Sequence, residues 1–409
     1  MTQKKPARDY HRPRPGMPFP PSWTWLFDET VPNWVKNKYS PRESWKGKPF
    51  EEKDSQFFFK GVGELSELFT EQRPGRLPDY FAHPRFRSGY LLYFLPLQAA
   101  KFITVFSLHH QAIEAALKHS QKTGVLRVAD LGAGPGTASI ALVQYILANY
   151  REDMPILEFE WYDSNREVME DGCRLLETMS ESFPKLRGKI RVNPIIKSWQ
   201  QACKTLKGPY SLIFFGHVLN EAPQAADERL LSQVIEASAG GGILFLEPAT
   251  KRSAQILASL RQLLIDRELI EPSGRAFWGP CLHAGICPLG EGRDWCHFSV
   301  RADIPGHWFK RISKALGSER QWVKFSYLWL SSKDARPSLP DSSLKRVVSD
   351  PLRAHGQRSG PAEVLLCEPE RPGRRAVGVN EDIQRGDLVK NRIPAGPLSG
   401  ASGRKGGRA

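Results

Sequence analysis

A hydrophobic run at residues 125–131 leads into a segment in which three glycines alternate with other residues. The segment reads Asp-Leu-Gly-Ala-Gly-Pro-Gly-Thr, from Asp130 to Thr137. Glycines allow a tight turn and let a ligand approach the backbone, while the start of the following helix offers N–H groups without partners. A strand, a glycine loop and a helix in this order predict a loop that binds a nucleotide-type ligand.

The spacing of the glycines distinguishes two kinds of cofactor loop. A dinucleotide-binding loop reads G-x-G-x-x-G, whereas this segment reads G-A-G-P-G-T and has an acid two residues before its first glycine. That arrangement is typical of class I methyltransferases, in which the loop contacts the methionine part of S-adenosylmethionine. We therefore predict that S-adenosylmethionine is bound by Asp130, Gly132, Gly134, Pro135, Gly136 and Thr137.

A second acid supports the same cofactor. Asp163 ends the next predicted strand, and Ser164 follows it. A carboxylate at this place can accept hydrogen bonds from both ribose hydroxyls of a nucleoside. The adenine is expected after the third strand, near Lys197, Ser198 and Trp199, although Trp199 equally fits a place in the core. A Rossmann-like domain that no longer binds cofactor remains the alternative.

Residues for the transfer chemistry are harder to find. Methyltransferases that act on exocyclic amines of bases carry a D/N-P-P-Y type motif after the fourth strand, and this chain has Gly-His-Val-Leu-Asn-Glu at 216–221. The cysteine nucleophile of cytosine-C5 enzymes is also missing there. His217 is a candidate base, and Asn220 and Glu221 are candidates to orient a substrate. They fit equally well as helix caps and cofactor-pocket residues, so the sequence supports cofactor binding better than methyl transfer.

Four of the six cysteines have a spacing that suits a metal centre. Cys281, Cys287 and Cys296 form C-x5-C-x8-C in a loop rich in Gly and Pro, and Cys367 ends a later hydrophobic run. Disulfides are not expected without a secretory signal. Four thiolates can hold zinc or an iron–sulfur cluster. Structural zinc favours tight C-x2–4-C pairs, so the wider spacing favours a 4Fe–4S cluster.

Zinc and the absence of any metal remain alternatives to the cluster. His283 and His297 lie between or beside the cysteines and could serve as zinc ligands. Cys173 and Cys203 lie in predicted helices and are interpreted as buried thiols.

The elements that position these residues alternate between strand and helix. Short hydrophobic strands separated by helices predict a parallel, doubly wound α/β sheet, which is the class I methyltransferase Rossmann-like fold. The predicted strands lie at 125–131, 156–163, 190–196, 210–221 and 240–250. Further strand-like runs at 295–302, 323–330 and 362–368 indicate a cysteine-rich, mainly β, metal-binding region.

The pattern divides the chain into five parts. A basic arm rich in Pro and Trp, predicted to be extended and anchored by its tryptophans, precedes a helical cap, the cofactor domain, the Fe–S-binding region and a disordered basic tail. Their predicted bounds are 1–48, 49–122, 123–275, 276–378 and 379–409.

Charge and hydropathy limit the partners. The net charge is +14, and the ranges 1–48 and 371–409 contribute +6 each, so basic ends on a nearly neutral centre favour a polyanion such as RNA. Tails that only aid solubility are the alternative. No uninterrupted run of about 18 apolar residues occurs, so we expect no membrane span. The first 22 residues lack a secretory h-region, and their prolines disfavour a transit helix, which indicates a cytoplasmic protein.

Several segments together resemble one family: the methyltransferase-like assembly factors of the small ribosomal subunit, which include a mitochondrial small-subunit protein and bacterial relatives. The likeness covers roughly residues 50–378, and its most specific part is the cysteine pattern. The segments that carry it are Tyr90–Tyr93, Asp130–Gly136, His217–Glu221, Leu246–Pro248, Asp294–Phe298, Arg346–Pro351 and the four cysteines.

The resemblance implies a monomeric protein that binds small-subunit rRNA and ribosomal proteins during maturation. It also implies a 4Fe–4S cluster held by Cys281, Cys287, Cys296 and Cys367. A bacterial member would be cytoplasmic, and a eukaryotic member would work in the mitochondrial matrix. Two functions stay open: an assembly factor that carries both cofactors without catalysis, and an active S-adenosylmethionine-dependent rRNA methyltransferase. A radical S-adenosylmethionine enzyme is excluded, because that chemistry uses C-x3-C-x2-C.

Overall fold

The structure is a computed structural model, and it describes most of the chain in twelve ranges. The described residues are 10–11, 19–71, 79–150, 154–221, 228–238, 241–270, 274–290, 294–317, 322–333, 343–353, 362–378 and 381–390. Expectations for the first nine residues and for 391–409 lie outside these ranges.

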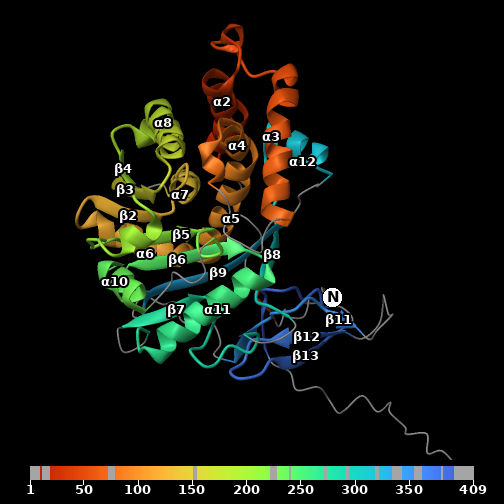
Figure 1. The fold of residues 1–409 in the computed structure, drawn as a ribbon. Helices are drawn as coiled ribbons and strands as arrows, with labels where there is room; N and C mark the ends of the chain where they lie inside the picture. The colour runs from red at the N-terminus through yellow and green to blue at the C-terminus, as the bar shows by residue number, and fades with distance from the viewer. Residues whose placement is uncertain are drawn as a thin grey trace, which may run out of the picture.

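One large sheet organises the molecule (Figure 1). Its strand order is β4-β3-β2-β5-β6-β9-β7, and β8 pairs with the end of β9 that β7 leaves free. The first five of these strands run parallel, and β9 is antiparallel to both β6 and β7. The strands are β2 Val125–Leu131, β3 Ile156–Asp163, β4 Ile190–Ile196, β5 Leu212–Gly216, β6 Gly242–Pro248, β7 Arg275–Gly279, β8 Phe298–Arg301 and β9 Trp322–Ser332. The five predicted parallel strands are therefore confirmed, whereas the runs at 295–302 and 323–330, predicted for the metal-binding region, supply β8 and β9 of this same sheet.

Helices cover both faces of the sheet, because its central strands are apolar on both sides. Helices α5, α7 and α8 contribute to the core on one face, and α9, α10 and α11 contribute to a second core on the other. Their bounds are α5 Leu95–Leu108, α7 Thr137–Asn149, α8 Arg166–Ser182, α9 Trp199–Cys203, α10 Glu228–Ser238 and α11 Lys251–Asp266.

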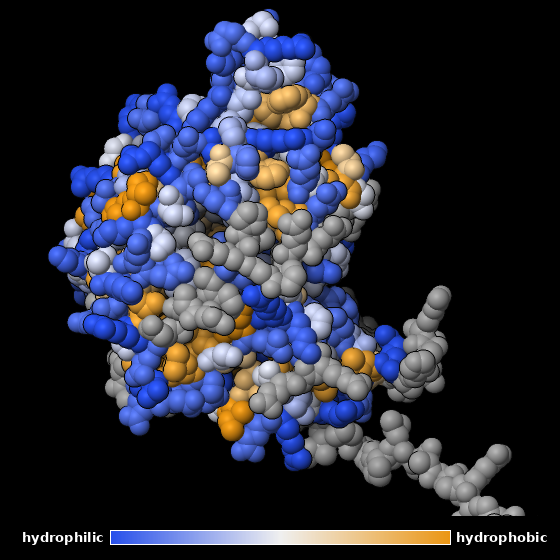
Figure 2. Space-filling model, viewed as in Figure 1, coloured by the Kyte–Doolittle hydropathy of each residue, from blue (hydrophilic) through white to orange (hydrophobic). Residues whose placement is uncertain are grey.

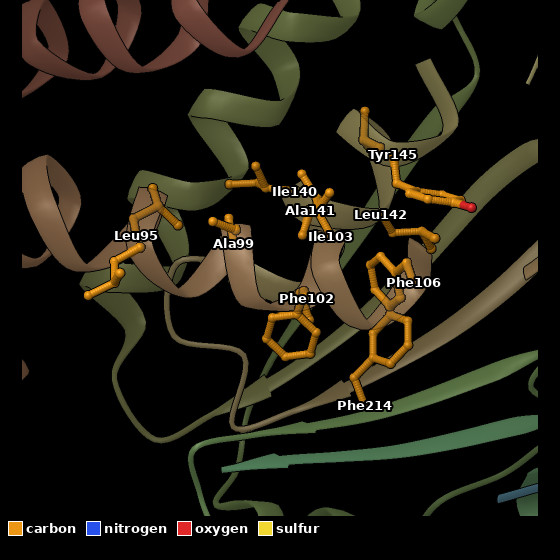
Figure 3. Packing of buried hydrophobic residues seen from close by; sticks show 14 of the residues in the cluster. Leu95, Ala99, Phe102, Ile103, Phe106, Ile140, Ala141, Leu142, Tyr145 and Phe214 are labelled. Atoms are coloured by element: carbon orange, nitrogen blue, oxygen red, sulfur yellow. The ribbon is translucent and has the colours of Figure 1, made fainter. Parts of the chain in front are cut away.

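The first core is built where α5 and α7 cross over β5 (Figure 3). Phe102 and Phe106 lie one turn apart on α5 and both point at Phe214 on β5, with ring centroids 6.1 and 5.6 Å away. Phe106 also contacts the ring of Tyr145 on α7 edge-on. This packing fixes α5 beside the carboxyl ends of the strands, where the glycine loop begins.

The N-terminal region is a helical cap, as the spacing of apolar residues predicts. Its helices stand above one face of the sheet in Figure 1. They are α1 Pro21–Thr24, a π-helical turn at Trp25–Thr30, α2 Val31–Tyr39, α3 Glu52–Glu71, α4 Pro84–Gly89, a second π-helical turn at Tyr90–Phe94, α5, and α6 His110–Gln121.

The N-terminal arm is helical and not extended from Pro21 to Tyr39. Its tryptophans do anchor it, as expected. Trp23 is fully buried and donates to the carbonyl of Pro305 across 3.0 Å, while Trp34 donates to the Asp171 carboxylate across 2.9 Å. Prolines sit at the first turns of these helices, where a missing N–H does no harm.

One continuous helical run, Pro84–Leu108, is long and apolar enough to cross a membrane by length and composition. In this structure 89% of its most apolar window is buried inside the protein. Its apolar character is therefore explained by its place in the core.

The C-terminal region forms two small sheets beside the large one, drawn in blue in Figure 1. One has the order β1-β14-β10, so residues near both chain ends pair with each other. The elements are β1 Tyr10–His11, α12 His307–Ala315, β10 Leu344–Arg346, β11 Leu352–Arg353, β12 Ala362–Leu366, β13 Gly373–Val377 and β14 Leu388–Lys390. The region predicted as a disordered tail from 379 thus contains a strand at Leu388–Lys390.

Candidate cofactor cleft and cysteine centre

The glycine loop adopts a backbone that only glycine enters easily. Gly132, Gly134 and Gly136 have φ angles of 76°, 52° and 70°. A Cβ atom on Gly136 would lie 2.0 Å from the ring of Trp161. The loop therefore needs glycine both for its backbone angles and for its contact with the sheet.

Asp130, at the end of β2, supports the helix that follows the loop. Its carboxylate accepts hydrogen bonds from the hydroxyl of Ser139 at 2.8 Å and from the Ser139 N–H at 3.3 Å. Burial raises its pKa to about 7, although the Ser139 bonds oppose this shift. The acid before the first glycine thus fixes the start of α7 beneath the ligand cleft.

Asp163, at the end of β3, joins the glycine loop to the next helix. One carboxylate oxygen accepts from the N–H of Gly134 and the other from the N–H of Asn165, each at 2.9 Å. Burial raises its pKa. The carboxylate lies beside the loop at the end of strand two, where a ribose-binding acid is expected.

A cleft of about 470 Å³ opens over the carboxyl ends of the strands. This volume lies within the roughly 300–1,000 Å³ of small-molecule sites. Most of the residues predicted from the sequence line it: Asp130, Gly132, Gly134, Thr137, Asp163, Ser164, Ser198, Trp199, His217 and Glu221.

Four predicted residues, Pro135, Gly136, Lys197 and Asn220, are not among those lining the cleft. The carbonyl of Pro135 packs against Gly172 of α8, and Gly136 faces Trp161, so both support the loop from behind. The side chain of Lys197 donates instead to the hydroxyl of Thr205 at 3.2 Å.

The helical cap supplies one wall that sequence reasoning missed. Asp79, Tyr80, Phe81, Tyr90 and Phe102 line the cleft. The rings of Tyr80 and Phe81 lie 4.4 Å apart, and those of Phe81 and Tyr90 lie 5.1 Å apart. Aromatic residues in a helical cap look like core residues in a sequence, and only the fold brings them to the loop.

His217 and Glu221 enter the cleft from the turn after β5. His217 has a φ angle of 62°, which is uncommon outside glycine, and its N–H donates to the carbonyl of Leu246 at 2.8 Å. Glu221 accepts from the Tyr80 hydroxyl at 3.3 Å. Burial raises the pKa of Glu221 to about 7, and the charge of Asp163 adds to the shift.

The turn that carries these two residues is held by a fully buried acid. Glu247 on β6 accepts from the N–H of Leu219 at 2.9 Å, and its side chain has no exposure to solvent. Burial raises its pKa to about 8, with a further contribution from Glu221. The acid of the Leu246–Pro248 segment therefore has a positional role.

The four predicted cysteines line one cavity, although Cys367 lies 71 residues beyond Cys296 in the chain. The remaining walls are mostly apolar, with Leu257, Leu289 and Val348 among them. Cys367 is brought there by β12, and its N–H donates to the carbonyl of Arg346 at 2.8 Å. All four are free thiols.

The electrostatics of this cavity disfavour bare thiolates. Burial raises the pKa of Cys281 and of Cys296, and it raises the pKa of Cys367 to about 12. Neighbouring cysteines add to each of these shifts, while the buried Arg261 opposes those of Cys281 and Cys367. Ionised thiols at these three positions would therefore need a nearby positive charge to be stable.

The four cysteines line the same cavity without forming a compact metal site. Within the described ranges, no three His, Cys, Asp or Glu side chains are grouped so as to hold a single metal ion. His283 lies 3.4 Å from the sulfur of Cys367 through its Nε2 atom, while His297 interacts with its neighbour's carbonyl, that of Trp295, at 3.0 Å. The side chains that the fold brings together in this cavity are therefore the four cysteines.

The strand order, the antiparallel β9 and the glycine loop define a class I methyltransferase-like α/β protein. The family model "Mitochondrial small ribosomal subunit Rsm22" matches residues 93–390. The chain therefore belongs to the Rsm22 family, which confirms the resemblance expected from the sequence. The match includes the glycine loop, the other cofactor residues predicted from the sequence and the four cysteines, whereas the cleft residues Asp79 to Tyr90 precede it.

The chain also has distant similarity to solved structures. An rRNA methylase from Streptococcus thermophilus has 9% identity and a TM-score of 0.28, covering 51% of this chain and 87% of its own. The plantazolicin methyltransferase BpumL, solved with SAH, has 12% identity and a TM-score of 0.30, with 69% and 98% covered. MNMC2 from Aquifex aeolicus has 14% identity and a TM-score of 0.29, with 55% and 58% covered. No curated protein sequence matches this chain.

Proposed function

We propose that this Rsm22-family protein is an assembly factor of the small ribosomal subunit that binds rRNA while carrying S-adenosylmethionine and a 4Fe–4S cluster. The observation that carries the proposal is the family match over residues 93–390, a range that includes every predicted ligand of both groups. It works in the compartment of the ribosome that it assembles, which is the mitochondrial matrix in a eukaryote.

The cleft supports S-adenosylmethionine as its ligand. The glycine loop offers a close backbone approach for the methionine part, and Asp163 offers a carboxylate for the ribose. Ser198 and Trp199 line the part of the cleft beyond β4, where the adenine fits. Calorimetric titration of the purified protein with S-adenosylmethionine and with S-adenosylhomocysteine tests this assignment. If neither compound gives a binding signal, the assignment is wrong.

The cysteine cavity supports a 4Fe–4S cluster with Cys281, Cys287, Cys296 and Cys367 as ligands. Four thiols from separate segments line one cavity with apolar walls, and buried arginine offsets the negative charge of thiolates. The cluster would link the cysteine loop to β12 and so stabilise the C-terminal region. Iron and sulfide analysis of anaerobically purified protein tests it, and stoichiometric zinc without iron would support the alternative centre.

A second candidate function is methyl transfer to rRNA. It is favoured by the continuation of the cleft from the cofactor loop to His217, Glu221 and Tyr80. Near neutral pH Glu221 lies close to its pKa of about 7, so it could accept or release a proton. Immature small subunits incubated with methyl-labelled S-adenosylmethionine separate the two functions. Label in rRNA that disappears in Glu221→Gln would establish the enzyme.

A further inference from the structure

The central part of the chain contains a long stretch without a single acid. Between Glu181 and Glu221 there are 39 residues, seven of them Lys or Arg and none Asp or Glu. The seven are Lys185, Arg187, Lys189, Arg191, Lys197, Lys204 and Lys207. Their sum of +7 equals half the net charge of the whole chain. The central part of the chain is thus nearly neutral as a whole, but residues 182–220 within it are strongly positive.

The fold places this stretch along one border of the large sheet. Among the described strands β4 pairs with β3 alone, so it is an edge strand; the loop before β4 leads into that edge, and after β4 the chain turns into α9, which packs against β3 and α10. Lys185, Arg187 and Arg191 are exposed, and so are Lys204 and Lys207 after α9. We call these seven basic residues, together with β4, the basic edge.

Few acids reduce the charge of this surface. Among the described residues, no ion pair joins any of the seven to a carboxylate. Glu158 is the β3 partner of Arg191 in the strand register, yet its carboxylate binds Arg127 at 3.0 Å, as Glu160 does at 2.8 Å. The positive potential of the edge is therefore directed to solvent.

Protection of an exposed strand explains only part of this pattern. Edge strands often carry charges that prevent pairing with other chains. One or two charges of either sign achieve that, whereas seven of one sign repel one another and cost stability. A partner that compensates the repulsion is expected, and a chain of phosphates has the matching charge and spacing.

The direction of the edge connects it to the cofactor cleft. β4 has seven residues and so runs for about 23 Å. It ends at Ile196, and Lys197 is followed directly by Ser198 and Trp199, which line the cleft. Ile196 is 42% exposed, so the edge also offers apolar contact. Figure 2 shows a small orange patch over β4 bordered by blue.

We infer that the basic edge binds the phosphate backbone of a single RNA strand and guides it along β4 to the mouth of the cleft. This inference rests on the proposed rRNA binding and names the surface that performs it. The phosphates contact the lysines and arginines, while sugars or bases lie over the exposed apolar residues near Ile196.

The test compares two variants with the same loss of charge. The edge variant is Lys185→Gln/Arg187→Gln/Arg191→Gln, and all three side chains are exposed. The control is Lys310→Gln/Arg311→Gln/Lys314→Gln on α12, which lies on the opposite side of the molecule (Figure 1). The probe is a fluorescent, mixed-sequence single-stranded RNA, and its affinity for the full-length protein is measured over a range of salt concentrations.

The edge variant should lower the slope of log K against log salt by about 2, since each single-strand phosphate contact contributes about 0.7. The α12 control should keep the wild-type slope. Equal slopes for the edge variant and wild type would overturn the inference while leaving RNA binding intact. Wild-type protein that binds no RNA would instead overturn the proposed function. If polyglutamate binds as tightly as the RNA and competes with it, the basic edge binds an acidic protein instead, and the inference is overturned.

A second measurement does not depend on variants. Wild-type protein is cross-linked to the same RNA containing 4-thiouridine, and the modified peptides are mapped. Cross-links within residues 183–207 are expected. Cross-links confined to other parts of the chain would overturn the inference.

Discussion

The N–H of Gly134 donates to the carboxylate of Asp163 across 2.9 Å, so the glycine loop and the end of β3 hold each other in place. An Asn at 163 presents one oxygen and one amide nitrogen, and it cannot accept from both Gly134 and Asn165. We predict that Asp163→Asn weakens S-adenosylmethionine binding by about 10- to 100-fold, the loss expected for one charge-assisted hydrogen bond.

Calorimetric titration measures this change. Glu170→Gln removes the same charge from an exposed position on the neighbouring α8 and should leave the affinity unchanged. Equal affinities for both variants and the wild type would show that Asp163 does not contact the cofactor.

Two glycines with nearly the same backbone angle should respond differently to alanine. Gly136 and Gly188 have φ angles of 70° and 69°, but a Cβ at Gly136 would collide with Trp161, whereas a Cβ at Gly188 meets open space. We predict that Gly188→Ala costs about 1–2 kcal/mol through backbone strain alone. Gly136→Ala should cost clearly more, because a rigid ring in the core must move.

Urea unfolding of both variants provides the comparison. Equal losses of stability would contradict the prediction, because they would mean that the loop or Trp161 can move to make room for a Cβ at position 136.

Glu247 should make the protein less stable as the pH rises. Its pKa in the folded protein is raised from 4.5 to about 8, so between these values the folded state holds a proton that the unfolded state releases. The stability therefore falls as the pH rises from about 5 to about 8. Glu247→Gln should remove the part of this dependence that Glu247 contributes and add stability on the order of 4 kcal/mol at pH 8, while Asp130 and Glu221, whose pKa values are also raised to about 7, keep their parts.

Thermal unfolding across this pH range tests the effect of Glu247. Glu236→Gln, an exposed substitution on α10, should keep the wild-type pH profile. A Glu247→Gln profile parallel to that of the wild type would contradict the prediction.

Cys296→Ser should abolish the proposed 4Fe–4S cluster, because one of its four proposed thiolate ligands is lost. We expect the variant to lose iron and sulfide and to unfold its C-terminal region at lower temperature. Cys173→Ser, on α8 and away from the cavity, is the matched control and should keep both properties. Retention of metal and melting temperature by Cys296→Ser would remove the basis of the four-cysteine assignment.

The sequence predicts the parallel strands and selects most of the residues that line the two cavities, because these signals are local or depend on residue type. The glycine loop is contiguous, Asp163 follows a clear strand, and the cysteines are rare residues. The sequence predicts that Cys367 converges with the other three cysteines, and in the structure all four line one cavity.

The rest depends on contacts between distant segments. Tyr80 and Phe81 reach the cleft only because the helical cap folds over the glycine loop. The arm is helical because Trp23 and Trp34 gain buried partners at Pro305 and Asp171, which its proline-rich sequence does not reveal. The basic edge is missed when charge is summed over the long central region, because acids elsewhere in that region cancel its positive charge.

The small sheet β1-β14-β10 sets an order in time for the protein's biosynthesis. In this sheet Val389 pairs with both Tyr10 and Lys345. The residue after Lys345 is Arg346, whose carbonyl accepts from the N–H of Cys367. The parallel strands are complete at Pro248, long before β14 has been synthesised. β14 can pair with β10 only after Lys390 has emerged, so the strand beside Cys367 gains its partner after the parallel sheet has formed.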